Sequence, residues 1–167
     1  MILNKKEEFL TMKNRNWKPL LLIAGATLLA GAFSTFLSGD SRESYRLLRK
    51  PLLAPRAIVF PIVWTLLYLL MSISAWLIYE TRQRGKHNAL KFYVGQLAVN
   101  LLWPLLFFGM KLYLFSFLWL LFLLLLVILM IFRFYQLSAA AALLQIPYVL
   151  WLIFAGYLNF SFYLLNR

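Results

Sequence analysis

The stretch PIVWTLLYLLMSISA, residues 61–75, decides the fold class of this chain. It carries no charge, and proline, tryptophan, tyrosine and small residues recur along it at steps of three or four. Such steps place side chains on one face of an α-helix. Two more apolar stretches repeat the pattern, and the three stripes are Pro61, Trp64, Tyr68, Met71 and Ala75; Gln96, Asn100, Trp103 and Phe107; and Pro147, Trp151, Ala155 and Asn159. Because lipid does not require amides and indoles on a helix, the stripes predict an aromatic-lined interior that receives a ligand.

Charged residues divide the chain into segments of membrane length. Of its 167 residues 63% are hydrophobic and only 13% are charged, and the mean hydropathy is +0.79. A hydrocarbon core of roughly 30 Å is crossed by about 20 apolar residues in a helix. The chain is therefore predicted to be an all-α polytopic membrane protein, a five-transmembrane-helix bundle. The expected spans lie at about 19–39, 57–79, 92–110, 112–132 and 141–165 within one membrane domain, residues 17–167.

Basic residues gather in the connections between these spans, and the formal net charge is +12. Ten lysines and arginines fall on the side of the N-terminus and seven on the other. The positive-inside rule then predicts an N-terminus inside and a C-terminus outside. We expect a bacterial plasma membrane, because outer-membrane proteins are mostly β-barrels. Residues 1–16 are predicted to be a polar basic tail, in which Met12 would serve equally as a start. Since the cations flank spans, we expect membrane lipid and not nucleic acid as their partner.

Several kinds of chemistry lack the residues they need. The chain has no cysteine, and its single histidine, His87, falls in a stretch predicted to be a polar loop, so no metal site and no required cofactor are predicted. No aspartate or glutamate falls inside a predicted span, which disfavours an ion-coupled transporter. One loop histidine cannot complete a hydrolytic triad within the bundle.

The connection between the first two spans, about residues 39–58, is long and basic. Ser41 is predicted to cap a short helix that runs to about Arg49. Pro51 and Pro55 then impose a stiff, extended chain before the second span. Such a segment would act as a lid over a pocket, or alternatively lie on the headgroups as an interfacial helix.

Some conspicuous residues in the spans have purely structural interpretations. Gly95 and Val99 form a small-xxx-small pattern that predicts a homodimer seam on the third span. Asn100 would equally serve to join neighbouring helices through hydrogen bonds. Trp17 and Trp119 are typical of the interfacial aromatic belt.

Four motifs in order along the chain resemble the TspO/MBR family, the tryptophan-rich sensory and translocator proteins. They are YRLLRKPLLAP (45–55), FPIVWTLLYLLM (60–71), QLAVNLLWPLLFF (96–108) and PYVLWLIFAGYLN (147–159), and the resemblance covers about residues 17–166. It implies a five-helix membrane bundle, usually a homodimer. It also implies a pocket for tetrapyrroles such as protoporphyrin IX and, in animal members, for cholesterol and synthetic ligands.

Carried over by position, the resemblance implies a set of ligand-binding residues. They are Tyr45, Lys50, Pro51, Trp64, Tyr68, Asn100, Trp103, Phe107, Trp151, Ala155 and Asn159. Trp64 and Trp151 match the two tryptophans implicated in porphyrin photodegradation by some bacterial members, which makes them the candidate catalytic residues. The chain departs from the family at the connector, where Ser44 and Leu53 replace tryptophans and Arg56 replaces a proline.

A flat apolar macrocycle with carboxylates at one edge suits such a pocket. Indoles and phenyl rings would stack on its faces, and Arg49, Lys50 and Arg56 would reach its propionates at the headgroup level. Three functions follow as alternatives. The first is a tetrapyrrole-binding sensor, carrier or regulator in a porphyrin or stress response. The second is a light- and oxygen-dependent porphyrin-degrading enzyme, and the third is a membrane scaffold whose pocket holds lipid.

Overall fold

The computed structural model describes residues 16–167, which form helices and contain no strand. The prediction of a polar tail and of a start at Met12 lies outside these residues, apart from Asn16. In chain order the elements are α2 (Lys18–Leu37), α3 (Ser41–Leu47), α4 (Val59–Glu80), α5 (Lys86–Pro104), the π-helical turn η1 (Leu105–Gly109), α6 (Tyr113–Tyr135), α7 (Ala139–Leu143) and α8 (Ile146–Asn166).

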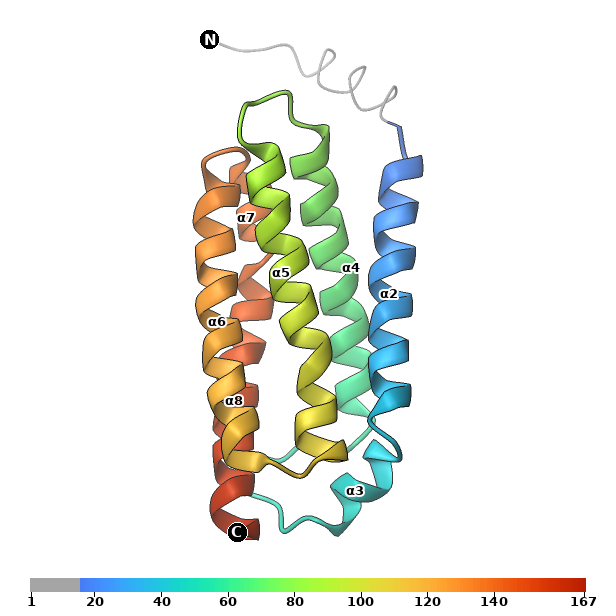
Figure 1. The fold of residues 1–167 in the computed structure, drawn as a ribbon, viewed down its shortest axis with the longest axis vertical. Coiled ribbons are helices and arrows are strands. Elements are labelled where there is room, and N and C mark those ends of the chain that lie inside the picture. The colour runs from blue at the N-terminus through green and yellow to red at the C-terminus, as the bar shows by residue number, and fades with distance from the viewer. Residues whose placement is uncertain (1–15) are drawn as a thin grey trace.

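Five helical segments are long and apolar enough to cross a membrane, which confirms the predicted fold class. They are α2, α4, α5 with η1, α6, and α7 with α8. The third span begins at Lys86 and not at about residue 92, so His87, predicted to lie in a loop, is in the first turn of α5. The spans run alternately up and down an elongated bundle (Figure 1). The connector with α3, the turn between η1 and α6, and the C-terminus share one end of the bundle, which we call the connector end. The protein is therefore an integral multi-pass membrane protein.

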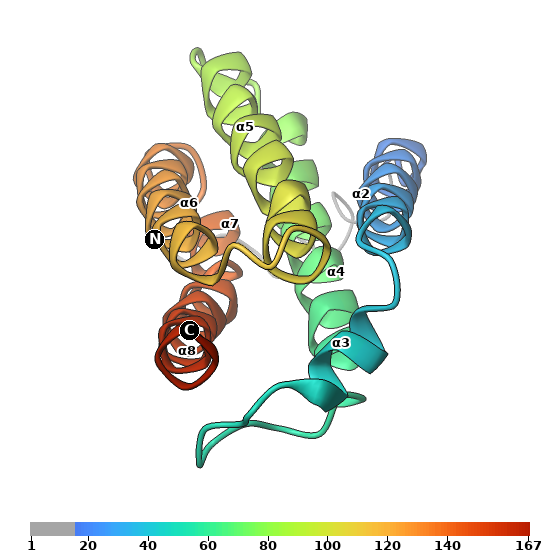
Figure 2. The same ribbon diagram turned by 60° about the horizontal axis from the view of Figure 1, so that its bottom comes forward.

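The helices pack in two neighbouring groups. α6 lies against both α5 and α8, while α2 lies against α4 and α5. Viewed from the connector end, α6 and α8 stand on one side and α2 on the other, with α4 and α5 between them (Figure 2). Large apolar side chains such as Leu22, Phe36 and Leu125 point outward, as expected of surfaces that face lipid.

Short polar side chains join the spans where the backbones approach closely. The Thr27 and Tyr93 hydroxyls are hydrogen-bonded at 2.7 Å between α2 and α5, and Ser34 donates to the Leu101 carbonyl nearby. On α4, the Ser74 hydroxyl donates to the Ala141 carbonyl at 2.6 Å. Within a membrane such bonds satisfy groups that lipid cannot satisfy, and they fix the rotation of each helix.

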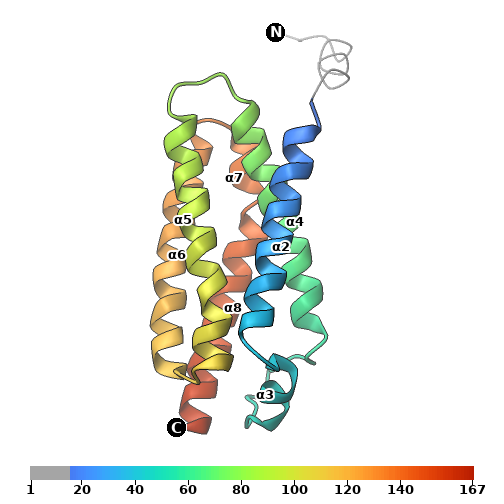
Figure 3. The same cartoon turned by 45° about the vertical axis from the view of Figure 1, so that its right-hand side comes forward.

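The connector contains a short helix, as predicted, but this helix begins and ends at other residues than expected. The N-cap of α3 is Asp40 and not Ser41, because an Asp40 carboxylate oxygen accepts the Glu43 N–H at 2.9 Å. The helix ends at Leu47 instead of Arg49, and the backbone of Leu48 is already extended (ψ 142°). α3 lies below the ends of α2 and α4 (Figure 3).

The third span changes geometry near its end. Pro104 has no N–H with which to bond the Asn100 carbonyl, so the regular α-helical pattern cannot continue there. The following turn is wider, and the Met110 N–H reaches the Leu105 carbonyl five residues back at 2.8 Å. Such π-turns are frequent at functional sites. Here the turn lies beside α3, at the connector end of the bundle.

Candidate functional site

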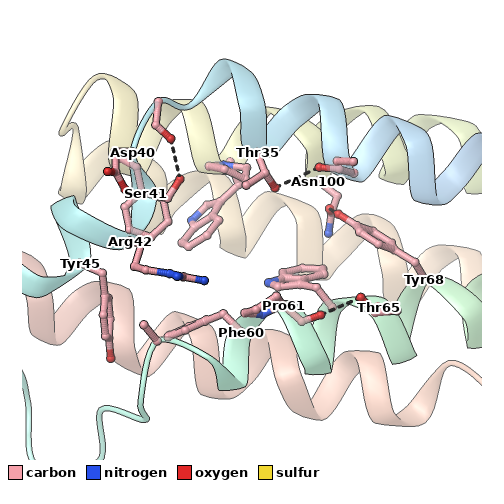
Figure 4. Close-up of a pocket in the computed structure, with 18 of the residues that line it drawn as sticks. Thr35, Asp40, Ser41, Arg42, Tyr45, Phe60, Pro61, Thr65, Tyr68 and Asn100 are labelled. Carbon is pink, nitrogen blue, oxygen red and sulfur yellow. Dashed lines mark hydrogen bonds between the residues drawn. The ribbon is translucent and has the colours of Figure 1, made fainter.

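A cavity of about 590 Å³ lies between α2, α4 and α5, and α3 adjoins it at the connector end. Its walls come from all four helices and from η1. The lining residues are Leu28, Gly31, Ala32 and Thr35; Gly39, Asp40, Ser41, Arg42 and Tyr45; Ala57, Phe60, Pro61, Trp64, Thr65 and Tyr68; and Asn100, Trp103, Pro104 and Phe108. Thr35 and Thr65 line it yet are exposed, so the cavity opens to the surface. Figure 4 shows the side chains that surround it.

Two indoles give the cavity its aromatic character. Trp64 of α4 is half-buried and packs beside Tyr68, with ring centroids 5.5 Å apart. Trp103 of α5 is buried and stacks on Phe107 at 5.2 Å. Phe107 itself lies in the core behind Trp103 and does not line the cavity. Both indoles lie at the cavity wall, as the stripes on the second and third spans predict.

A chain of hydrogen bonds begins with Tyr68 and Asn100 in the cavity wall and continues into the core. The Tyr68 hydroxyl donates to the Asn100 side-chain oxygen at 3.0 Å, and the Asn100 amide nitrogen donates to the Tyr148 hydroxyl at 2.7 Å. Tyr148 in turn donates to the side-chain oxygen of Gln96 at 3.1 Å. Asn100 thus joins α4, α5 and α8 and also lines the cavity, so the structure accommodates both interpretations of this residue.

Asn159 does not line the cavity, although the resemblance implies that it binds the ligand. Its side-chain oxygen accepts the Trp103 indole N–H at 3.0 Å and the Ser116 hydroxyl at 3.1 Å. Its amide nitrogen donates to the Tyr113 carbonyl at 2.7 Å. These bonds occupy the amide and hold the Trp103 ring in place, so Asn159 supports the cavity from behind.

Trp151 does not line the cavity, contrary to the expectation that all three indoles share one. It lies in a separate apolar groove between α4 and α8, with Pro147 and Phe154 from its own helix and leucines from α4. Its ring meets Phe60 edge to face at 6.0 Å, and Phe60 lines the cavity on its other side. The Trp151 N–H is buried and has no hydrogen-bond partner within residues 16–167. Ala155, one turn further along α8, is buried in the core.

The connector contributes a buried tyrosine to the cavity. The Tyr45 hydroxyl donates to the Pro55 carbonyl at 2.6 Å, and its ring packs edge to face on Phe60 and Phe162. Burial raises the pKa of this phenol above its ordinary value. The Lys50 ammonium lies over the same ring, 5.3 Å from its centroid. Tyr45 therefore fastens the connector to the bundle at the edge of the cavity.

The cations expected to meet a ligand's carboxylates lie elsewhere. Lys50 donates to the Arg46 carbonyl, and Lys50, Pro51, Arg49 and Arg56 are all outside the cavity lining. Arg49 is held through its backbone, whose N–H donates to the Asn166 side-chain oxygen at 2.8 Å. The basic side chain that does line the cavity is Arg42. Arg42 and Tyr45 are three residues apart on one face of α3, as they would also be in a helix capped by Ser41. The sequence did not show toward which neighbours this face turns.

Two tryptophans of the predicted aromatic belt also have defined surroundings. The Trp119 indole N–H donates to the Val99 carbonyl at 2.7 Å, so its polar edge joins α6 to α5. Trp17, at the start of α2, remains mostly exposed and stacks on Trp76 at 5.1 Å. Within residues 16–167 no three His, Asp or Glu side chains gather as a metal centre would require.

The fold and the site together define a class of molecule, the small polytopic α-helical membrane proteins with an aromatic-lined cavity among their spans. The TspO/MBR family matches residues 20–164 of the chain. The chain belongs to this family, as the motifs predict.

Relatives from three domains of life resemble nearly the whole chain. It is 36% identical over 153 residues to the tryptophan-rich sensory protein of Cereibacter sphaeroides, covering 92% of this chain and 94% of that one. It is 35% identical over 142 residues to the tryptophan-rich protein TspO of Archaeoglobus fulgidus, covering 84% and 92%. It is 33% identical over 149 residues to the translocator protein of Homo sapiens, covering 86% and 88%.

Proposed function

We propose that the protein binds a tetrapyrrole such as protoporphyrin IX in this cavity and acts as a sensor, carrier or regulator in a porphyrin or stress response. The observation that carries the proposal is the cavity of about 590 Å³ with Trp64, Trp103 and Phe60 in its walls. Its volume falls within the range of roughly 300 to 1,000 Å³ that is usual for small-molecule sites. The implied family function supports the same ligand class.

The chemistry of the walls suits a flat, mostly apolar ring. Indole and phenyl faces stack with other aromatic systems, at about 0.5 to 1.5 kcal/mol per pair beyond the area they bury. Trp103 is held by Asn159, and Tyr68 is held by Asn100, so two walls of the site are positioned before a ligand arrives. Preorganised walls reduce the entropy lost on binding.

Fluorescence titration tests this proposal. Purified protein in detergent should show saturable quenching of tryptophan emission by protoporphyrin IX. Trp64→Phe should weaken binding about three- to tenfold, because a phenyl ring covers less of the macrocycle than an indole does. Trp17→Phe is the matched control, since Trp17 lies outside the cavity lining, and it should bind as the wild type does. Quenching that never saturates, or equal affinity in both variants, would contradict the proposal.

Light- and oxygen-dependent degradation of the bound porphyrin is the second candidate activity. The observation that favours it is the Trp64 indole in the cavity wall, where it would contact the ring. Trp151 would act only through Phe60, because it lies in the neighbouring groove. Under illumination, Trp64→Phe should slow the loss of porphyrin absorbance more than Trp151→Phe does. Equal loss in wild type and both variants would exclude a catalytic role for the indoles.

We also propose a homodimer through the α5 face that carries Gly95 and Val99. Gly95 is exposed, and a Cβ added there would meet no atom within 4 Å, so a second backbone has room to approach. Gly95→Cys should cross-link to a dimer in membranes, and recovery of monomers only would refute the proposed dimer.

We also propose that the protein lies in a bacterial plasma membrane with the connector end outside. An external thiol reagent should label Ser44→Cys in intact cells, and protection of this cysteine from the reagent would refute the proposed orientation.

A further inference from the structure

The cavity has a charged end that the family resemblance did not assign. Of its lining residues, Asp40 and Arg42 are the two with ionisable charged groups, and both belong to the start of α3. The other lining side chains are uncharged, and their polar groups are hydroxyls, indole N–H groups and the Asn100 amide. A ligand that enters the cavity therefore meets charge at the connector end alone.

The side chains of Asp40 and Arg42 differ in the hydrogen bonds and ion pairs that they make within the protein. The Asp40 carboxylate caps α3 by accepting the Glu43 N–H. The ion pair found within residues 16–167 joins Arg46 to Glu43 at 3.3 Å, and it leaves Arg42 out. Arg42 also has no hydrogen bond to any side chain or carbonyl in that part of the chain. Its guanidinium donors remain available.

The Arg42 side chain also points to a place where a ligand would meet its guanidinium. In Figure 4 it extends from α3 into the cavity, toward Phe60 and Pro61 on α4. Tyr45, three residues later on the same face of α3, is buried and fixed to the Pro55 carbonyl. That anchor holds the face of α3 that carries Arg42 toward the cavity.

We propose that Arg42 is the specificity-determining residue of the cavity and binds a carboxylate at one edge of an otherwise apolar ligand. A guanidinium presents paired N–H donors that match both oxygens of a carboxylate. The inference rests on the proposed tetrapyrrole site and deepens it. It replaces Arg49, Lys50 and Arg56 as the carboxylate partner, and it predicts that the ligand lies with its acidic edge toward α3 and its ring between the indoles.

A comparison of two ligands in several variants tests the assignment. The probes are protoporphyrin IX, which carries two propionates, and its dimethyl ester, which has the same ring without the charges. Arg42→Gln should weaken binding of the diacid about tenfold, since charge-assisted hydrogen bonds are lost. It should leave binding of the ester within about twofold. Arg42→Lys keeps the positive charge but loses the paired N–H donors of the guanidinium. Its affinity for the diacid should lie between those of the wild type and Arg42→Gln.

Arg46→Gln is the matched control, since it lies on the same short helix but outside the cavity lining. It should bind both probes as the wild type does, and so should Arg49→Gln. Equal loss of diacid and ester in Arg42→Gln, or no loss of either, would overturn the role of Arg42 while leaving the site intact. Failure of both probes to bind the wild type saturably would instead overturn the proposed site itself.

Discussion

At the scale of single residues, Gly31 sets the distance between α2 and α4. A Cβ at this position would collide with the aromatic carbon Cε2 of Tyr68, closer than real side chains approach one another. The ring would have to move, and its hydroxyl would leave Asn100. A single missing methyl group therefore preserves both the packing of the two helices and the hydrogen bond between Tyr68 and Asn100 in the cavity wall.

Gly31→Ala is accordingly expected to lower both thermal stability and ligand affinity. Overpacking of a buried contact costs about 1 to 3 kcal/mol, and the displaced Tyr68 would narrow the cavity. Gly25→Ala is the control on the same helix, because a Cβ there meets nothing within 4 Å. The control should be neutral or stabilising by up to about 1 kcal/mol, through better helix propensity. Thermal unfolding in detergent and porphyrin titration measure both effects, and equal behaviour of the two variants would contradict this role for Gly31.

At the scale of elements, the Tyr45 hydroxyl ties α3 to the rest of the connector, while the Tyr45 ring and the Asn166 amide hold the connector to the bundle. Tyr45→Phe removes the hydroxyl that donates to Pro55 and should loosen residues 48–57. A hydrogen bond of this kind contributes about 1 kcal/mol. Faster amide hydrogen exchange in the connector, with unchanged exchange in α6, is the expected result. Unchanged exchange in the connector would show that other contacts hold it.

The contribution of this tyrosine should also depend on pH. Burial raises the pKa of Tyr45 in the folded protein above its unfolded value of about 10. A raised folded-state pKa means that the stabilisation is complete below the unfolded pKa and is lost as pH rises through the folded one. The difference in unfolding free energy between wild type and Tyr45→Phe should therefore stay constant up to about pH 9 and shrink above pH 10. A difference that falls between pH 6 and 8 would contradict this assignment.

The stripes also show what periodicity alone reveals about an element. Alternating steps of three and four keep Gln96, Asn100, Trp103 and Phe107 on one face of the third span, formed by α5 and η1, and all four are buried. The α8 stripe advances only by fours, so at 100° per residue it turns by about 120° from Pro147 to Asn159. Trp151 accordingly faces the groove toward α4, whereas Asn159 bonds Trp103 on α5. A stripe that advances only by fours therefore predicts two neighbouring faces of a helix and not one.

At the scale of the whole molecule, the five spans were predictable because charges such as Lys18, Arg56 and Glu80 fall near their ends. The cavity walls on α4 and α5 were predictable from their stripes. The position of Arg42 was not, because the direction of its helix face depends on how the connector folds back against α4. Composition also leaves the pairing of helices open, since a stripe marks a face without naming the neighbour that the face meets.

The proposed function requires that a flat ligand occupies the cavity between α2, α4 and α5, against Trp64 and Trp103. The structure of the protein determined with protoporphyrin IX bound tests it most directly. We expect the macrocycle within stacking distance of those two indoles, with a propionate turned toward α3. A macrocycle seated instead in the groove beside Trp151, or on the outer face of the bundle, would contradict it.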